Sequence, residues 1–302
     1  MFIIKTRGEG MELFFQTLIN GLQTGSIFAL IAIGYTMVYG IAKMINFAHG
    51  DIIMVGAYSI CILTTQSNVP AIPAVILTIL ICTLVGITVE RWAYKPLRSA
   101  PSLAVLITAI GVSLLLQSLA LIIFGEKQRP FVSIIKVPSI NIGGVVIQGI
   151  ALVTFIVTII CMVVLNLFIR KTKLGRAMRA VSEDKQAAQL MGINVNRTIS
   201  MTFAIGSALA GVAGILYICQ YLAVKPTLGA LPGIKAFVAA VLGGIGSIPG
   251  AMVGGILLGV IESIFKCYLP SELTDAIVFG VLVLVLLVKP SGILGSKRIE
   301  KV

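Results

Sequence analysis

The chain has 302 residues, of which 58% are hydrophobic and 11% are charged, whereas a soluble domain carries about 25% charged residues. Apolar runs of about 20 residues recur without period-two alternation, which excludes a soluble globular protein and predicts an all-α polytopic membrane protein. The net charge of +12 comes from Lys and Arg in the gaps between apolar runs, where the positive-inside rule places them. It therefore does not indicate nucleic-acid binding.

The first residues do not have the order of a signal peptide. In residues 1–10 the charges follow a short apolar start, whereas a cleavable signal has them before its apolar core. We expect these ten residues to be dispensable, with Met11 as a candidate start, and the first membrane segment to begin at Leu13.

Eight apolar segments follow, and each is long enough for a crossing. The seventh is too long for one simple span, and residues 243–250 (GGIGSIPG) interrupt it, which predicts two half-length helices. Irregular backbone at membrane depth survives only inside protein or along a cavity. We expect eight or nine transmembrane segments, including broken or half-length helices, in a single transmembrane domain over residues 1–302. The segments are residues 13–38, 45–65, 71–92, 103–124, 147–169, 198–222, 236–266 and 273–288.

Basic residues in the gaps predict the orientation. The gap 170–197 is the richest in Lys and Arg and is assigned to the cytoplasm. Alternation then places the N-terminus outside, and it places the C-terminus inside if residues 236–266 cross twice. The gap 125–148 faces outward, although its basic residues weaken that assignment.

The second half of the gap 170–197 has the marks of a short helix. Ser182 is expected as its N-cap, and Glu183 and Asp184 would place negative charge on its first turn. Gly192 supplies the left-handed residue that commonly ends a helix. A membrane protein does not need such a flat, Ala-rich helix for its own folding. We interpret it as a docking surface for another protein.

Residues 43–51 (KMINFAHGD) hold the only histidine of the chain, beside a glycine and a carboxylate. Asn46 is expected to cap a new helix. Two interpretations remain open, a broken helix beside a path for a zwitterionic solute or an interfacial turn. No metal role is expected for His49, since no second His or Cys stands at ligand spacing. The candidate translocation-path residues are Asn46, His49, Gly50, Asp51, Gly243, Gly244 and Gly246.

Three further features have a structural and a functional interpretation. Glu262 and Lys266 have the i,i+4 spacing of an ion pair, for which a structural role is favoured over a place in a pathway. Glu90 is expected at a solvated helix end. Glycines at spacing four favour close packing within the chain over a seam between subunits; they are Gly21, Gly25, Gly246, Gly250, Gly254, Gly255 and Gly259.

The chain carries no nucleotide-binding or hydrolytic signature. A GxxxxGK[ST] loop, a Ser-His-Asp arrangement and a metal-hydrolase motif are all missing from the sequence. We therefore expect no enzyme activity and no cofactor on this chain, and any energy from ATP must come from a separate chain.

The chain resembles the permease subunits of bacterial ABC importers for branched-chain amino acids, the LIV permease family, and among them the shorter of the two permease types. INFAHGD at residues 45–51 and LGGIGSIPGA at residues 242–251 are the most specific matches. Three further segments carry the resemblance, residues 29–40 (ALIAIGYTMVYG), residues 175–194 and residues 290–295 (PSGILG).

The resemblance implies an ABC importer permease fold in the bacterial cytoplasmic (inner) membrane. It also implies four partners: a second, related permease, two cytoplasmic ATPase subunits that use ATP and Mg, and a periplasmic solute-binding protein. Importer permeases bear an EAA-x-x-x-G loop that fits the ATPase, and residues 186–188 (QAA) with Gly192 match its spacing with Gln in place of Glu. The candidate ATPase-coupling residues are Ser182, Glu183, Asp184, Ala187, Ala188, Gly192 and Ile193.

Two other functions remain open. A sibling importer for urea or short-chain amides would have a similar permease, since specificity in such systems depends largely on the binding protein. An ion-coupled amino-acid carrier would need an intramembrane ion site, and the few intramembrane acids argue against one.

Overall fold

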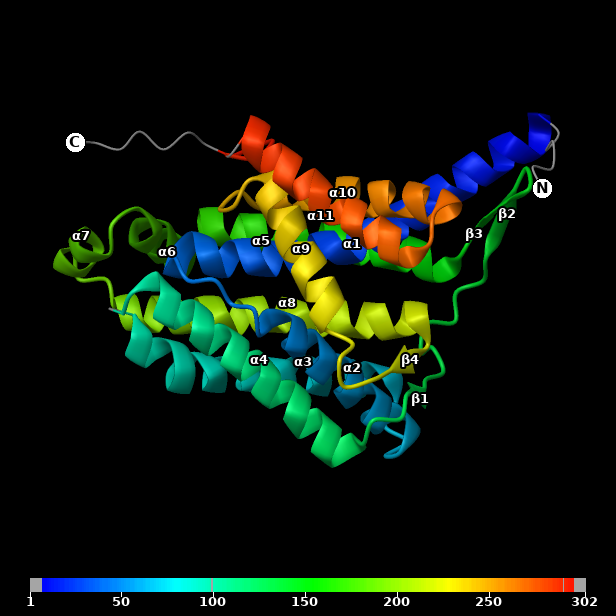
Figure 1. Cartoon of the computed structure of the whole chain (residues 1–302). Helices are drawn as coiled ribbons and strands as arrows, with labels where there is room; N and C mark the ends of the chain where they lie inside the picture. Colours follow the sequence, from blue (N-terminus) through cyan, green and yellow to red (C-terminus); the bar gives the residue numbers. More distant parts are fainter. Residues whose placement is uncertain (1–6, 99, 290, 296–302) are drawn as a thin grey trace.

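The computed structural model describes residues 7–98, 100–289 and 291–295 of the chain (Figure 1). Helices account for most of this part, as the composition predicts. Helices α1, α5, α8 and α10 run roughly parallel or antiparallel to one another, while α4, α9 and α11 run obliquely to them. The α-helices are α1 (Arg7–Ala42), α2 (His49–Thr65), α3 (Ala71–Val89), α4 (Ser102–Phe124), α5 (Gly149–Lys171), α6 (Lys173–Glu183), α7 (Lys185–Leu190), α8 (Val195–Tyr221), α9 (Ala230–Gly243), α10 (Ile248–Tyr268) and α11 (Ser271–Val288).

Seven helices of the described part are long and apolar enough to cross a membrane, and α2 and α9 are shorter apolar helices. With 17 and 14 residues, α2 and α9 are about 25 and 21 Å long, less than the hydrocarbon core of about 30 Å. The chain is therefore a multi-pass helical membrane protein. The prediction of two half-length helices in residues 236–266 is right for α9 and wrong for α10, whose 21 residues suffice for a full span.

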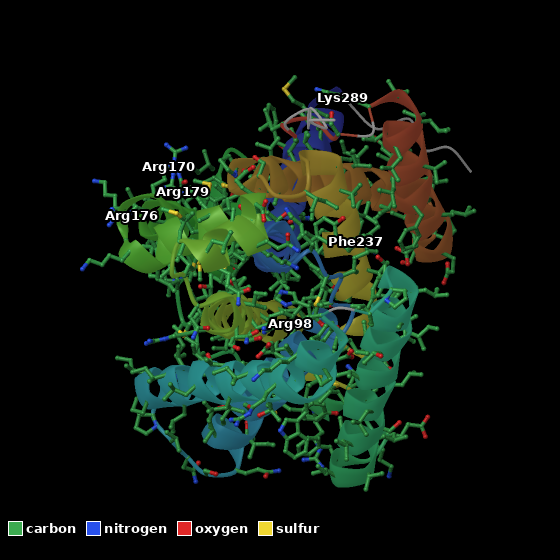
Figure 2. The ribbon with its side chains drawn as sticks, turned by 90° about the vertical axis from the view of Figure 1, so that its left-hand side faces the viewer. Arg98, Arg170, Arg176, Arg179, Phe237 and Lys289 are labelled. Atoms are coloured by element: carbon green, nitrogen blue, oxygen red, sulfur yellow. The ribbon has the colours of Figure 1, made fainter. Side chains whose placement is uncertain are left out.

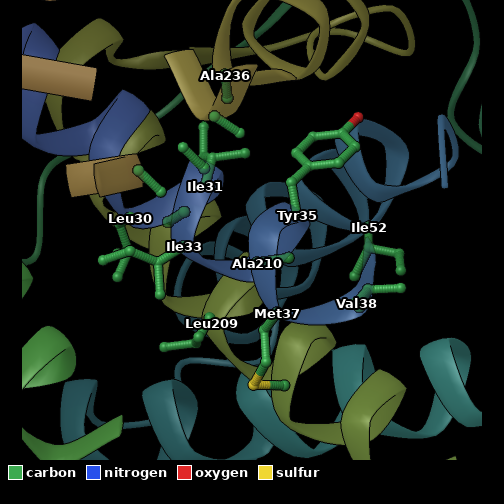
Figure 3. Packing of buried hydrophobic residues seen from close by; sticks show 14 of the residues in the cluster. Leu30, Ile31, Ile33, Tyr35, Met37, Val38, Ile52, Leu209, Ala210 and Ala236 are labelled. Carbon is green, nitrogen blue, oxygen red and sulfur yellow. The ribbon is translucent and has the colours of Figure 1, made fainter. Parts of the chain in front are cut away.

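The centre of the bundle is α1, which packs against α5, α8, α9 and α10. Its residues Leu30, Ile31 and Ile33 are fully buried, and Figure 3 shows them with Leu209 of α8 and Ala236 of α9. A helix that is apolar all round is buried either among neighbouring helices or in lipid, and α1 is buried among its neighbours. The outer helices α3, α4, α5 and α11 instead leave large apolar side chains exposed, as a surface that faces lipid does.

A seam of small residues joins α1 to α10. A Cβ added at Gly259 would lie 2.2 Å from the Cα of Gly25, and one added at Gly255 would lie 2.3 Å from the Cα of Ala29. Such close approach of two backbones provides van der Waals packing, which stabilises helix pairs in lipid, where the hydrophobic effect between helices is missing. The predicted intramolecular packing is thus confirmed for these glycines, and Gly21 faces Val260 in the same seam.

The gap 125–148 contains two short strand pairs that the all-α prediction misses. Strands β2 (Ile140–Ile142) and β3 (Val145–Ile147) form a hairpin around Gly143 and Gly144, whose φ angles of +58° and +87° suit a two-residue turn. The amide of Gln16 on α1 bonds both the N–H and the carbonyl of Val146. The other pair joins β1 (Arg129–Pro130) to β4 (Ala223–Val224).

The opposite end of the bundle is polar and basic. Figure 2 looks onto it, with Arg170, Arg176 and Arg179 around the junction of α5 and α6, and Lys289 after α11. Helices α6 and α7 protrude from this end (Figure 1). The basic tail residues 297–301 and the first six residues of the chain lie outside the described part.

Candidate functional site

The protruding loop is built from two capped helices. Thr172 caps α6, since its Oγ1 accepts a hydrogen bond from the N–H of Gly175 at 2.9 Å. Asp184 caps α7, since its Oδ1 accepts from the N–H groups of Gln186 and Ala187 at 2.7 and 3.0 Å. The carboxylate of Asp184 lies at the positive N-terminal end of α7, and it accepts from two N–H groups that would otherwise be unpaired.

The prediction of Ser182 as the cap is therefore wrong. Helix α6 continues through Ser182, whose hydroxyl donates to the carbonyl of Arg179 at 2.7 Å, and it ends at Glu183. Glu183 consequently lies on the preceding helix rather than on the first turn of α7. The cause is the extent of α6: because it runs on to Glu183, the next residue with a capping side chain, Asp184, begins α7.

The predicted end of the docking helix is confirmed. Gly192 has a φ of +79°, and the N–H of Ile193 donates back to the carbonyl of Ala188 at 3.0 Å. The side chain of Ala188 faces inward and is buried, whereas Leu190 and Met191 are 88% and 82% exposed. The sequence pattern indicates a flat, small surface, but the structure adds two large apolar side chains at its tip.

A polar cavity of about 530 Å³ separates α7 from the start of α8. Arg98, Lys185 and Asn196 are among its lining residues. The ammonium of Lys185 donates to the carbonyl of Ala42, the last residue of α1, at 2.9 Å. Burial, and then the charge of Arg98, lower the pKa of Lys185 below its ordinary value. The loop is therefore fixed to the core of the bundle at this point.

Beside this cavity, α3 ends in a π-helical turn, Glu90–Tyr94. Glu90 is 1% exposed, pairs with Arg98 and accepts a hydrogen bond from the hydroxyl of Ser200 at 2.7 Å. The prediction of a solvated helix end for Glu90 is thus wrong. The sequence places Arg91 next to it, but the wider π turn directs Glu90 inward toward Arg98, and such turns frequently occur at functional positions.

The same π turn holds Asn46. The hydroxyl of Tyr94 donates to Oδ1 of Asn46 at 2.8 Å, and both residues are buried. The prediction that Asn46 caps a helix is wrong, because α2 begins three residues later, after Ala48, without a side-chain cap. The side-chain amide of Asn46 instead joins the start of this segment to the π turn, through its hydrogen bond from Tyr94.

Residues 43–48 are non-helical, and in Figure 1 they return from the α6 end of α1 to the middle of the bundle, where α2 begins. A Cβ added at Gly50 would lie 2.4 Å from the carbonyl oxygen of Gly229, at the start of α9. The starts of the two short helices therefore touch inside the protein. This geometry agrees with the interpretation of residues 43–51 as a broken segment, and their place beside a solute path stays a prediction.

Several polar side chains lie around this contact. The imidazole of His49 is buried and lies 4.6 Å, between ring centroids, from Tyr35. Gly34 makes room for it, since a Cβ there would lie 2.6 Å from Nε2 of His49. Asp51 is buried and accepts a hydrogen bond from the amide of Gln117 on α4 at 2.9 Å. The structure thus brings Asn46, His49, Gly50 and Asp51 into one region.

The structure does not bring the second predicted glycine set to that region. Gly243, Gly244 and Gly246 lie at the other end of α9, about 20 Å along the helix from Gly229. Gly244 and Gly246 have φ angles of +105° and +96°. Gly243 accepts a hydrogen bond from the N–H of Leu294 at 3.0 Å, so this turn holds the segment after α11.

Four charged residues form a network that the sequence indicates only in part. The predicted pair of Glu262 with Lys266 is present. Lys235 of α9 adds to it, with its Nζ 2.8 Å from Oε1 of Glu262 and 2.6 Å from Oδ1 of Asp275 on α11. The i,i+4 spacing reveals one pair, whereas Lys235 stands in an apolar segment with no local partner.

These features define a class of protein: a polytopic helical membrane protein with discontinuous segments inside the bundle and a capped helix exposed at its basic end. The sequence profile of the family described as "Branched-chain amino acid transport system / permease component" matches residues 17–286. The chain belongs to that family.

Curated relatives match over almost their whole length. The high-affinity branched-chain amino acid transport system permease protein BraD of Pseudomonas aeruginosa is 45% identical, over 96% of this chain and 98% of BraD. LivH of Salmonella typhimurium and LivH of Escherichia coli K12, which bear the same description, are 44% and 43% identical over the same shares.

Proposed function

We propose that this chain is the permease subunit of an ATP-driven importer that moves branched-chain amino acids (leucine, isoleucine and valine) across the bacterial cytoplasmic membrane. One observation carries the proposal: relatives named for that transport are 43–45% identical over 96% of the chain. Fold and composition agree, since the protein is a multi-pass helical bundle.

The exposed helix α7 is the proposed docking site for a cytoplasmic ATPase. The bare side chains of Leu190 and Met191 offer the kind of apolar anchor that a groove on a partner buries. Two such ATPases, which would bind ATP and Mg, a second related permease and a periplasmic solute-binding protein complete the assembly. The positive-inside rule then places α6, α7 and the C-terminus in the cytoplasm.

The proposed mechanism is alternating access. Closure of the ATPase dimer on ATP would move α7, and the hydrogen bond from Lys185 to Ala42 would pass that movement to residues 43–51. Small shifts at such a contact are amplified when packed elements have two discrete arrangements. The translocation path is proposed to pass the touching starts of α2 and α9, where Asn46, His49 and Asp51 lie.

Uptake of labelled leucine into vesicles tests this proposal. The vesicles hold this chain with its four partner subunits, with or without ATP, and with unlabelled urea as competitor. A matched preparation carries ATPase subunits that bind but do not hydrolyse ATP. ATP-dependent leucine entry that urea leaves unchanged is the expected result. Entry of urea instead would contradict the substrate, and leucine uptake driven by an ion gradient without ATP would contradict the mechanism.

A further inference from the structure

An apolar groove lies between α2 and α4, which pack beside each other (Figure 1). Its volume is about 140 Å³, and its lining is almost wholly apolar. Met54, Tyr58 and Ala120 are buried at its floor, whereas Leu119 and Ile123 are 43% and 66% exposed at its rim. The groove therefore opens onto the lipid-facing surface of α4.

The length of the groove matches the depth of one lipid leaflet. Its lining runs from Met54 to Ile62 on α2 and from Leu116 to Phe124 on α4, a rise of about 12 Å along each helix. One leaflet supplies about half of a hydrocarbon core that is about 30 Å thick. An acyl chain thus fits the groove in length and in chemistry.

A positive charge lies at one end of the groove. The guanidinium carbon of Arg129, in β1, is 5.5 Å from the ring centroid of Phe124, and its Nη2 donates to the carbonyl of Phe124 at 2.9 Å. None of the ion pairs in the described part of the chain includes Arg129. This end of α4 points away from α6 and α7 (Figure 1).

Arg129 belongs to the gap that departs from the positive-inside rule. With α6 and α7 in the cytoplasm, residues 125–148 face outward, yet they include Lys127, Arg129 and Lys136. Nothing in the proposed function uses these charges. A phosphate group of the outer leaflet would give Arg129 the counter-ion that the protein does not provide.

A hydroxyl group without a partner lies at the same end. Tyr58 is 3% exposed, and in the described part of the chain its Oη has no hydrogen-bond partner. Its ring is stacked on Phe124, with centroids 4.2 Å apart, so Tyr58 and Arg129 both lie against one ring. A buried polar group of this kind needs a partner from a ligand or water. The ester oxygens of a phospholipid, which lie between its phosphate and its chains, are acceptors at that boundary.

We propose that the groove binds one acyl chain of an anionic phospholipid whose phosphate lies at Arg129. The chain packs along Met54, Leu116 and Ala120, and an ester oxygen accepts a hydrogen bond from Tyr58. A zwitterionic headgroup would bring a further cation to Lys127 and Arg129, so an anionic headgroup binds more tightly. The bound lipid fills the space between α2 and α4, whichever solute the protein transports.

Lipid-dependent unfolding of the full chain in detergent tests the groove, because a ligand of the folded state raises the unfolding midpoint. The probes are phosphatidylglycerol and phosphatidylcholine with the same acyl chains. Ile123→Gln places a polar group on the rim, and the concentration of either lipid that gives half of the shift should rise about tenfold. Ile122→Gln is the matched control, since Ile122 is 79% exposed and does not line the groove. Equal lipid responses of the two variants would overturn the site.

Arg129→Gln tests the position of the headgroup. It is expected to lower the preference for phosphatidylglycerol over phosphatidylcholine about fivefold, as the loss of one cation near anionic lipid does. Lys136→Gln, at an exposed lysine of the same gap, should keep the preference of the wild type. A preference that Arg129→Gln leaves unchanged would overturn the placing of the phosphate.

Mass spectrometry of the intact protein in detergent distinguishes a lipid from a protein neighbour. A phospholipid is expected to stay bound both to the free chain and to the chain assembled with the proposed second permease, and Ile123→Gln should lose it from both. Its loss from the wild-type chain on assembly would overturn the proposal, because a helix of the partner would then cover the groove.

Discussion

The ammonium of Lys185 on α7 donates to the carbonyl of Ala42 at the end of α1, across 2.9 Å. The non-helical segment 43–48 begins at the next residue and leads to the start of α2. We therefore expect a displacement of α7 to reach the backbone that positions Asn46 and His49.

Replacing Lys185 with Met should uncouple the loop from that segment. A hydrogen bond from a charged group contributes about 1.5–3 kcal/mol, so ATP-driven leucine uptake should fall about tenfold or more. Lys173→Met is the matched control, because Lys173 is an exposed lysine on the neighbouring helix α6. Equal uptake in the two variants would show that the contact between Lys185 and Ala42 has no part in coupling.

Tyr94→Phe should destabilise the protein through Asn46. Without the phenol, Oδ1 of a residue that is 2% exposed loses its donor, which costs about 1–3 kcal/mol. Thermal unfolding in detergent measures the change. Tyr268→Phe, which removes a hydroxyl from a side chain that is 75% exposed, should leave the unfolding midpoint unaltered; a similar shift in both variants would contradict the argument.

Local patterns in the sequence predict the membrane class, most of the segment positions and the break after Gly243. They also predict Gly192, because a left-handed helix end depends on one residue type. Asp184 and Ser182 show the limit of such patterns. Either residue is a good cap, and only the extent of the preceding helix α6 decides which one acts.

Long-range contacts account for what the sequence does not predict. Glu90 meets Arg98 and Ser200 only because the π turn redirects it, and Lys235 meets Glu262 only because α9 packs on α10. No spacing along the chain encodes these distances. The separation of Gly50 from Gly243 likewise follows from the length of α9, which no local pattern at either glycine reveals.

Lys235→Met should cost more stability than any change of a surface charge in this chain. It leaves Glu262, which is 2% exposed, with the partly exposed Lys266 as its remaining cation, so the cost should approach the about 3–5 kcal/mol of breaking a buried pair. The comparison is Lys266→Met, whose side chain is 40% exposed and whose loss should cost about 1 kcal/mol or less.

Unfolding of both variants in detergent gives the two values. The double variant Lys235→Met with Glu262→Gln removes the buried carboxylate that has lost its buried cation and should recover part of the loss. Failure of the second substitution to recover any stability would mean that packing of the lysine stem, rather than charge, explains the first.

Gly259→Ala should weaken the seam between α1 and α10. The added methyl group would lie 2.2 Å from the Cα of Gly25, so the two backbones must separate, and overpacking of this kind costs about 1–3 kcal/mol. Gly280→Ala on α11 is the control, because a Cβ there meets nothing within 4 Å. That control should be neutral or slightly stabilising, by up to about 1 kcal/mol. Yield and the unfolding midpoint in detergent report both effects, and equal behaviour would mean that the seam adapts without cost.

Gly192→Val tests whether the shape of the docking loop matters for coupling. At a φ of +79° a β-branched residue is strained, since only glycine and, less readily, asparagine adopt the left-handed region. A Cβ at position 192 meets no neighbouring atom within 4 Å. Membrane insertion of the protein and packing of the bundle should therefore survive, while ATP-driven uptake is lost. Gly192→Asn adds a side chain that tolerates this backbone and should keep most of the uptake. Wild-type uptake with valine at this position would show that the end of α7 need not be held in this conformation for the ATPase to drive transport.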